Sequence, residues 1–189
     1  VALCGVVLLS ATEIGRKAFY QCRNLSFAII PRCRTIGDQA FTYCHALQQI
    51  DCRNTLVIGD DAFNGCARAI SYNCRKVQQI EPGAFSFNHS LLQIQFDELT
   101  ELKRGTFGRC LSLRQVIAPK LQVVNDRVFI DATHKVNLVC NEQIQNENCK
   151  SGKLELFQDD LCGELKERKQ FFSAQRRTCV LCRRLKKMS

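Results

Sequence analysis

The stretch IGDQAFTYCHALQQI, residues 36–50, is one copy of a pattern that returns through most of the chain. Its phenylalanine recurs at a constant interval of 22 residues, and several other positions keep the same interval. Such agreement among independent columns establishes an internal repeat. The columns are Phe19, Phe41, Phe63, Phe85, Phe107 and Phe129; five residues earlier Ile14, Ile36, Ile58, Ile80, Leu102 and Val124; and three residues later Cys22, Cys44, Cys66, Asn88, Cys110 and Ala132.

A repeat of this length cannot enclose a hydrophobic core by itself, so neighbouring coils must stack and bury their apolar columns against one another. The segments LQQIDC (47–52), LLQIQF (91–96) and LRQVIA (113–118) alternate apolar and polar residues at their ends, which indicates strands with one buried face. Strands of successive coils would pair in parallel at about 4.8 Å. The sequence therefore predicts a six-coil solenoid, with Ala-Phe-x-x-Cys as a short helical or 3₁₀ turn on the opposite side.

The unit I-G-x-x-A-F-x-x-C-x-x-L-x-x-I resembles the BspA-type leucine-rich repeat. It stands intact from Ile36 to Ile50, and the resemblance covers residues 3–140. It implies a leucine-rich repeat solenoid with parallel strands on a concave face. It also implies a protein that binds other proteins, in a family with many surface-exposed members, and it implies no catalytic activity.

The columns stop after Cys140, which predicts three parts: a solenoid over residues 1–140, a polar connector over 141–152, and a basic helical segment over 153–189. In the last part Leu154, Phe157, Leu161 and Leu165 recur at helical spacing. The sixth repeat departs from the pattern at Ala132, as expected for a capping coil with looser packing around Phe129.

The composition is that of a globular protein, with 46% hydrophobic and 24% charged residues among 189. No apolar run is long enough to predict a membrane span. The formal net charge of +9 favours acidic partners. A basic C-terminal tail could bind an acidic partner or RNA, although a solvated helix end explains the same charges; its residues are Arg176, Arg177, Arg183, Arg184, Lys186 and Lys187.

Eight of the 13 cysteines occupy apolar repeat columns and are expected as buried free thiols, which favours the cytoplasm. A cell-surface location stays open if a signal peptide lies upstream of the opening residues. Cys179 and Cys182 form a C-x-x-C that could bind zinc together with Cys149 and Cys162, but a single close pair makes plain packing the preferred interpretation. No metal and no cofactor are therefore predicted.

Catalysis finds no support in the sequence. The histidines, His45, His89 and His134, follow positions of the repeat columns and belong to separate coils. Nucleophile, metalloprotease and phosphate-binding motifs are absent from the sequence. We therefore expect neither an enzyme nor a small-molecule substrate.

The preferred function is a protein-binding scaffold that uses the residues pointing outward from the concave strands. Two alternatives remain: a structural subunit of a ribonucleoprotein or cytoskeletal assembly docked by the basic C-terminal helix, and a cell-surface adhesin. The predicted binding residues are Gln48, Gln49, Asp51, Ser71, Asn73, Gln93, Gln95, Arg114 and Gln115.

Overall fold

The structure is a computed structural model that describes residues 3–133, 135–141, 144 and 149–152, the last three of them by their backbone alone. These residues belong to one compact unit, Val1–Leu154. The helical segment predicted for residues 153–189 lies outside the described residues.

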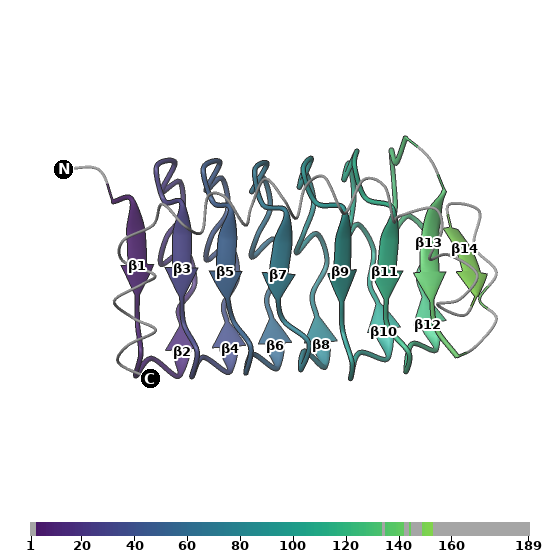
Figure 1. Cartoon of the computed structure of the whole chain (residues 1–189), viewed down its shortest axis with the longest axis horizontal. Helices are drawn as coiled ribbons and strands as arrows, with labels where there is room; N and C mark the ends of the chain where they lie inside the picture. The colour runs from purple at the N-terminus through teal and green to yellow at the C-terminus, as the bar shows by residue number, and fades with distance from the viewer. Residues whose placement is uncertain (1–2, 134, 142–143, 145–148, 153–189) are drawn as a thin grey trace, which may run out of the picture. The chain divides into compact units, whose positions relative to one another are not determined.

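Each coil of the solenoid contributes a long strand and then a short strand (Figure 1). The long strands are β1 (Gly5–Val7), β3 (Phe27–Ile29), β5 (Gln49–Asp51), β7 (Ser71–Asn73), β9 (Gln93–Gln95), β11 (Gln115–Ile117) and β13 (Val136–Val139). The short strands are β2 (Glu13–Ile14), β4 (Thr35–Ile36), β6 (Val57–Ile58), β8 (Gln79–Ile80), β10 (Glu101–Leu102) and β12 (Val123–Val124).

All pairings between neighbouring strands are parallel. Residues that are one repeat apart in the sequence are paired with each other. Ile50 of β5 lies beside Tyr72 of β7, one repeat later, and Ile36 of β4 lies beside Ile58 of β6. The predicted parallel solenoid is therefore confirmed. Both ladders are interrupted at the same level, between β7 and β9 and between β8 and β10.

The alternation within each long strand positions its side chains. In β5 the central Ile50 is buried, whereas its neighbours Gln49 and Asp51 point outward and are half-buried. Successive side chains of a strand point to opposite faces, so one outward column forms on each side of the buried one. These outward columns form the surface on which a partner could dock.

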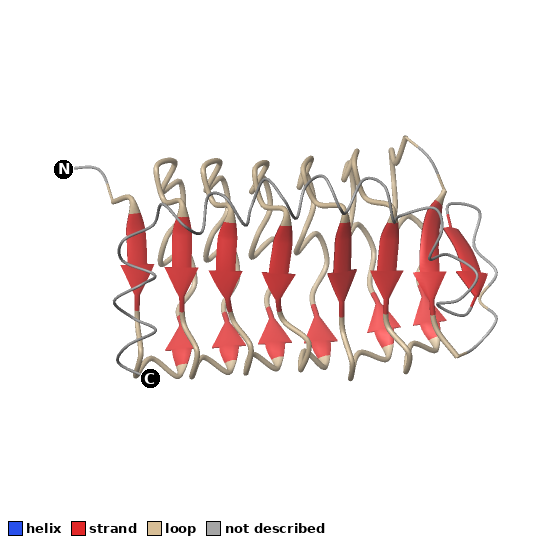
Figure 2. Ribbon diagram, in the orientation of Figure 1, coloured by secondary structure: helices blue, strands red, loops and turns tan. Residues whose placement is uncertain are grey.

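The helical or 3₁₀ turn predicted for Ala-Phe-x-x-Cys is wrong, because the described part of the chain contains no helix (Figure 2). The segment consists of β-turns instead: the Ala40 N–H donates to Gly37 O at 3.2 Å and the Cys44 N–H to Phe41 O at 3.2 Å. Between them, the Phe41 N–H donates to Ala62 O of the next coil at 2.7 Å. Alternate amides thus bind within the coil and to the next coil, a pattern that a helix cannot provide.

This alternation requires a left-handed backbone at two positions of every turn. Gln39 has a φ of 55° and Tyr43 a φ of 60°, each at the third residue of a turn, as in type II turns. Glycine occupies only three of these twelve positions. The two columns are Lys17, Gln39, Asp61, Gly83, Gly105 and Arg127, and Gln21, Tyr43, Gly65, Phe87, Arg109 and Asp131.

We predict that Gln39→Gly raises the free energy of unfolding by about 1 kcal/mol, because glycine adopts this conformation without steric cost. Urea unfolding followed by circular dichroism measures the change. Gln49→Gly, in strand β5, is the control and should lower stability by about 0.5–1 kcal/mol. A loss of stability in Gln39→Gly would show that the left-handed positions carry no strain.

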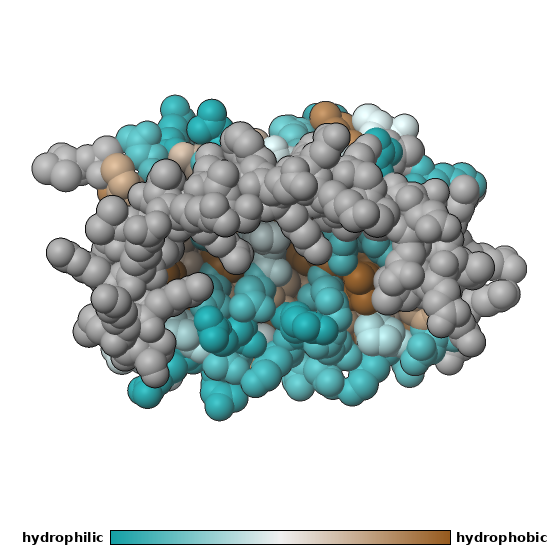
Figure 3. Space-filling view, in the orientation of Figure 1, coloured by the Kyte–Doolittle hydropathy of each residue, from teal (hydrophilic) through white to brown (hydrophobic). Residues whose placement is uncertain are grey.

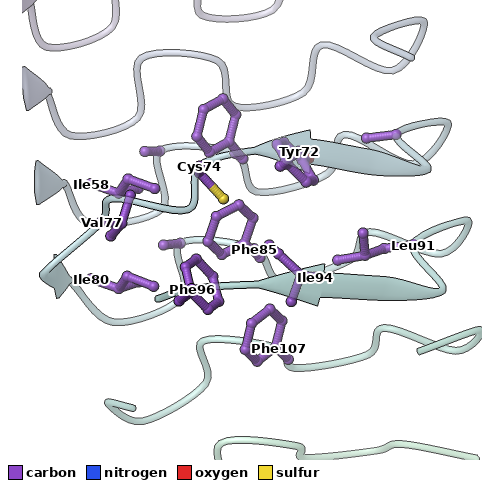
Figure 4. Close-up of a cluster of buried hydrophobic side chains, with 14 of the residues drawn as sticks. Ile58, Tyr72, Cys74, Val77, Ile80, Phe85, Leu91, Ile94, Phe96 and Phe107 are labelled. Atoms are coloured by element: carbon purple, nitrogen blue, oxygen red, sulfur yellow. The ribbon is translucent and has the colours of Figure 1, made fainter. Parts of the chain in front are cut away.

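The core is a ladder of stacked phenylalanines that runs through all six coils. The rings of Phe41 and Phe63 are stacked with centroids 5.3 Å apart, and those of Phe63 and Phe85 are 5.5 Å apart. Figure 4 shows Phe85 flanked by Tyr72, Phe96 and Phe107, which are buried like Phe85 itself. Each coil therefore completes the core of its neighbour.

The C-terminal end of the solenoid is better packed than the sequence suggested. Strand β14 (Cys149–Gly152) pairs in parallel with β13, with Cys149 beside Val136, and this strand was not foreseen in the polar segment 141–152. Phe129 is only 1% exposed. Within the ladder of six phenylalanines, the half-buried ring is that of Phe19 in the first coil.

We predict that Phe63→Ala and Phe129→Ala each lower the free energy of unfolding by about 3–5 kcal/mol, because both rings are fully buried. Phe19→Ala should cost clearly less, since its ring is partly exposed already. Urea unfolding of the three variants tests this order. A small loss for Phe129→Ala would mean that the last coil is loosely packed.

Candidate functional site

The predicted binding residues lie together on one surface, which we call the long-strand face and define as the outward residues of β5, β7, β9 and β11 with the residue preceding each strand. The parallel register places Gln49 beside Ser71 and Gln93 beside Gln115. Side chains one coil apart are therefore neighbours, at about the 4.8 Å spacing of paired strands.

Accessibility differs along this face. Ser71 and Asn73 of β7 are exposed and Gln115 is buried, with 2% exposure. The other predicted residues are half-buried; they are Gln48, Gln49, Asp51, Gln93, Gln95 and Arg114. The middle of the face, at β7, therefore offers the most accessible side chains.

Gln115 is not the exposed side chain that strand alternation predicts. Its Nε2 is buried and has no hydrogen-bond partner. A buried donor without an acceptor costs about 1–3 kcal/mol. Gln115 is therefore a poor position for testing contact with a partner, and Ser71 and Asn73 are better ones.

The C-terminal ends of the long strands carry a hydrogen-bonded network that the sequence analysis did not single out. Asp51 accepts hydrogen bonds from Arg53 Nε at 3.0 Å and from Asn73 Nδ2 at 3.1 Å. Asp97 accepts from Gln95 Nε2 at 2.8 Å and, across one coil, from Arg75 Nε at 3.0 Å. The signal was present in the sequence, because Arg53, Arg75 and Asp97 share one repeat column.

The two described histidines, His45 and His89, bind separate backbone carbonyls. His45 Nδ1 lies 2.9 Å from Gly65 O and His89 Nδ1 lies 3.0 Å from Arg109 O, each a carbonyl of the following coil. Since a carbonyl only accepts, Nδ1 carries the proton in both rings. Among the described residues, no three metal-binding side chains come together. His134 lies outside them.

The column thiols are buried in the core, apart from the half-buried Cys22 of the first coil. Burial raises the pKa of Cys44 to about 12 and that of Cys110 to about 12. Thiols of this column donate to backbone carbonyls. Cys44 Sγ lies 3.1 Å from Phe19 O, and Cys66 Sγ lies 3.2 Å from Phe41 O. Such protonated thiols are poor nucleophiles and poor metal ligands at neutral pH.

The remaining predicted sites fall mostly outside the described residues. Of the four weak zinc candidates only Cys149 is described; it is buried, and burial raises its pKa to about 11. Cys162, Cys179 and Cys182 lie outside the described residues, as does the whole basic tail, Arg176, Arg177, Arg183, Arg184, Lys186 and Lys187.

Tyr72 and Asn88 are two buried residues that depart from the repeat pattern, and they are hydrogen-bonded to each other. Tyr72 stands where other coils have Ala or an aliphatic residue, and Asn88 stands in the cysteine column. The Tyr72 hydroxyl donates to Asn88 Oδ1, and Asn88 Nδ2 donates to Phe63 O at 2.9 Å and to Phe85 O at 2.8 Å. Asn88 thus replaces a thiol donor and also satisfies the tyrosine.

We predict that Tyr72→Phe lowers the free energy of unfolding by about 1–3 kcal/mol, because it leaves Asn88 Oδ1 buried without a donor. Asn88→Cys should lower the free energy of unfolding by a similar amount, because it removes the acceptor of the Tyr72 hydroxyl. The double variant, which restores a thiol beside an apolar ring, should be more stable than the sum of the two losses implies. Strictly additive losses in urea unfolding would show that the two residues are independent.

The comparison with family profiles gives one match. The family described as "BspA type Leucine rich repeat region" matches residues 12–135 with six copies. A comparison with curated proteins gave no match. Among the described residues, none belongs to a helix with the length and hydrophobicity of a membrane span.

Two solved structures show the same fold. A leucine-rich repeat protein of T. pallidum is 25% identical, with a TM-score of 0.60, and the match covers 66% of this chain and 70% of that one. A leucine-rich cell surface protein of Faecalibacterium prausnitzii A2-165 is 20% identical, with a TM-score of 0.67. That match covers 77% of this chain but only 44% of the F. prausnitzii protein.

Proposed function

Because the chain belongs to the BspA-type leucine-rich repeat family, we propose that it is a non-catalytic scaffold that binds a protein partner on the long-strand face. The observation that carries this proposal is that each coil has buried columns, which form the core, and outward columns, which face solvent. The apolar repeat columns are buried in the core, so recognition must use side chains that point outward, such as those of the long-strand face.

The chemistry of the face suits protein recognition. Its outward positions carry amides, a hydroxyl and a few charges, which can donate and accept hydrogen bonds with main-chain and side-chain groups of a partner. They are held at fixed spacing by the parallel ladders, so binding orders few side chains and costs little entropy. The face is most accessible at Ser71 and Asn73.

A binding role is also supported by what the reactive side chains do. The described column thiols other than the half-buried Cys22 are buried, and His45 and His89 each form a hydrogen bond with a backbone carbonyl. These groups stabilise the coils and their junctions. The partner should therefore be held by contacts and should leave the chain unchanged.

We predict that Ser71→Arg lowers recovery of the partner about tenfold or more, because a bulky charge at the centre of an interface blocks contact and is desolvated on binding. The full chain and its variants would serve as bait, and the captured proteins would be quantified by mass spectrometry. Gln79→Arg is the matched control: it adds the same charge to the same coil, at an outward position of short strand β8.

Gln79→Arg should recover the partner as the unchanged chain does, and both variants should unfold at the same urea concentration. A partner that both variants retain, and that is lost when residues 176–189 are deleted, would overturn the proposal and place recognition in the basic tail.

A further inference from the structure

A cluster of exposed basic side chains adjoins the long-strand face, where the chain bends from the long to the short strand. We call it the basic bend and define it as Arg32, Arg34, Arg53, Arg75 and Lys76, all of them exposed. They follow β3, β5 and β7, so they come from three successive coils. Hydrophilic residues gather along the edge toward which the long strands run (Figures 1 and 3).

Arg53 and Arg75 are held in place within this cluster. Arg53 uses Nε and Nη2 on the two oxygens of Asp51, and Asp51 is fixed in turn by Asn73 Nδ2 at 3.1 Å. Arg75 uses Nε on Asp97, at 3.0 Å. A guanidinium anchored at one edge presents its other N–H groups in a fixed direction.

Donor groups remain unused at both arginines. Among the described residues, Arg53 Nη1 and both terminal nitrogens of Arg75 have no hydrogen-bond partner, and the two side chains are 59% and 57% exposed. The residues occupy the same repeat column in adjacent coils, so their backbones stand about 4.8 Å apart. Each guanidinium forms one ion pair, Arg53 with Asp51 and Arg75 with Asp97, so the unused N–H groups are the donors that a further anion could bind.

Lys76 adds to the imbalance. Its ammonium donates to the amide oxygen of Asn54 at 2.8 Å, which carries no charge to neutralise it. Asp51 pairs with Arg53, and Asp97 pairs with Arg75. Among the described residues, the other three cations of the basic bend form no ion pair. The basic bend therefore favours a ligand that brings negative charge and accepts several hydrogen bonds.

We propose that the basic bend binds an acidic segment of the protein partner, with one carboxylate accepting hydrogen bonds from both Arg53 and Arg75. This inference rests on the proposed function and gives the partner a chemical character. Charge-assisted bonds from two guanidinium groups to one carboxylate are stronger than neutral ones and fix its orientation.

An acidic peptide fits this surface better than a nucleic acid does. The next bend carries Asp97 and Glu98, which end the run of cations after three coils, so the surface matches a short acidic segment better than a long phosphate chain. None of the bend residues 31–34, 53–56 and 75–78 is aromatic, so bases would find no ring on which to stack. The adjacent amides of the long-strand face can bind the rest of a peptide.

The test measures fluorescence anisotropy of a labelled octaglutamate peptide with the full chain at about 0.15 M NaCl. The variant R53Q/R75Q should lower the affinity about tenfold or more, because both bridging donors are lost. R16Q/R104Q is the control: it removes the same charge from two exposed arginines at the beginning of the Phe-containing turns. It should change the affinity less than about twofold, since charges of remote residues are screened.

Equal losses in the two double variants, with unchanged urea unfolding, would overturn the proposal and indicate diffuse charge attraction. A single-stranded oligouridylate that binds more tightly than the peptide and loses the same affinity in R53Q/R75Q would overturn it in favour of a nucleic acid. If Ser71→Arg still abolishes partner capture in either case, the proposed function stands and only the acidic-segment inference fails.

Discussion

The stacking of one coil on the next is the interaction on which every other feature depends. A 22-residue coil has no core of its own, and it acquires one only when its phenylalanine ring lies against that of its neighbour. The same contact is reinforced at the backbone, where the Phe63 N–H donates to Ala84 O at 2.8 Å. Because both interactions require the same register, a slip by one residue would break them together.

This constraint separates the columns that hold the fold from those that can vary. Positions facing the core are mostly Phe, Ile, Leu, Val, Ala or Cys, whereas the column at the bend reads Pro31, Arg53, Arg75, Asp97 and Pro119. The charge of that column changes sign along the solenoid without disturbing the stack, since these side chains are paired with neighbours such as Asp51 or with solvent. Surface chemistry is therefore set coil by coil, on a scaffold that stays the same.

The apolar repeat columns could be predicted from the sequence. The features that depend on contacts between coils could not. The phenylalanine, isoleucine and leucine columns were recognised because burial imposes their spacing. The left-handed turns were not, because Tyr43 and Phe87 have no local preference for positive φ and are held there by hydrogen bonds to the next coil. Strand β14 escaped notice because its pairing with β13 departs from the 22-residue offset: Cys149 lies beside Val136.

The core and the outer face both change at the same level of the solenoid. Both ladders are interrupted between the third and fourth full coils, where Tyr72 and Phe96 replace the smaller side chains of neighbouring coils. A closely packed core must make room for these larger side chains, and the hydrogen-bonded ladders end at the same level. The outward residues of β7, Ser71 and Asn73, are the exposed members of the long-strand face, and Arg75 follows in the same coil. The most accessible part of the long-strand face thus lies at the level where the core holds its larger aromatic side chains.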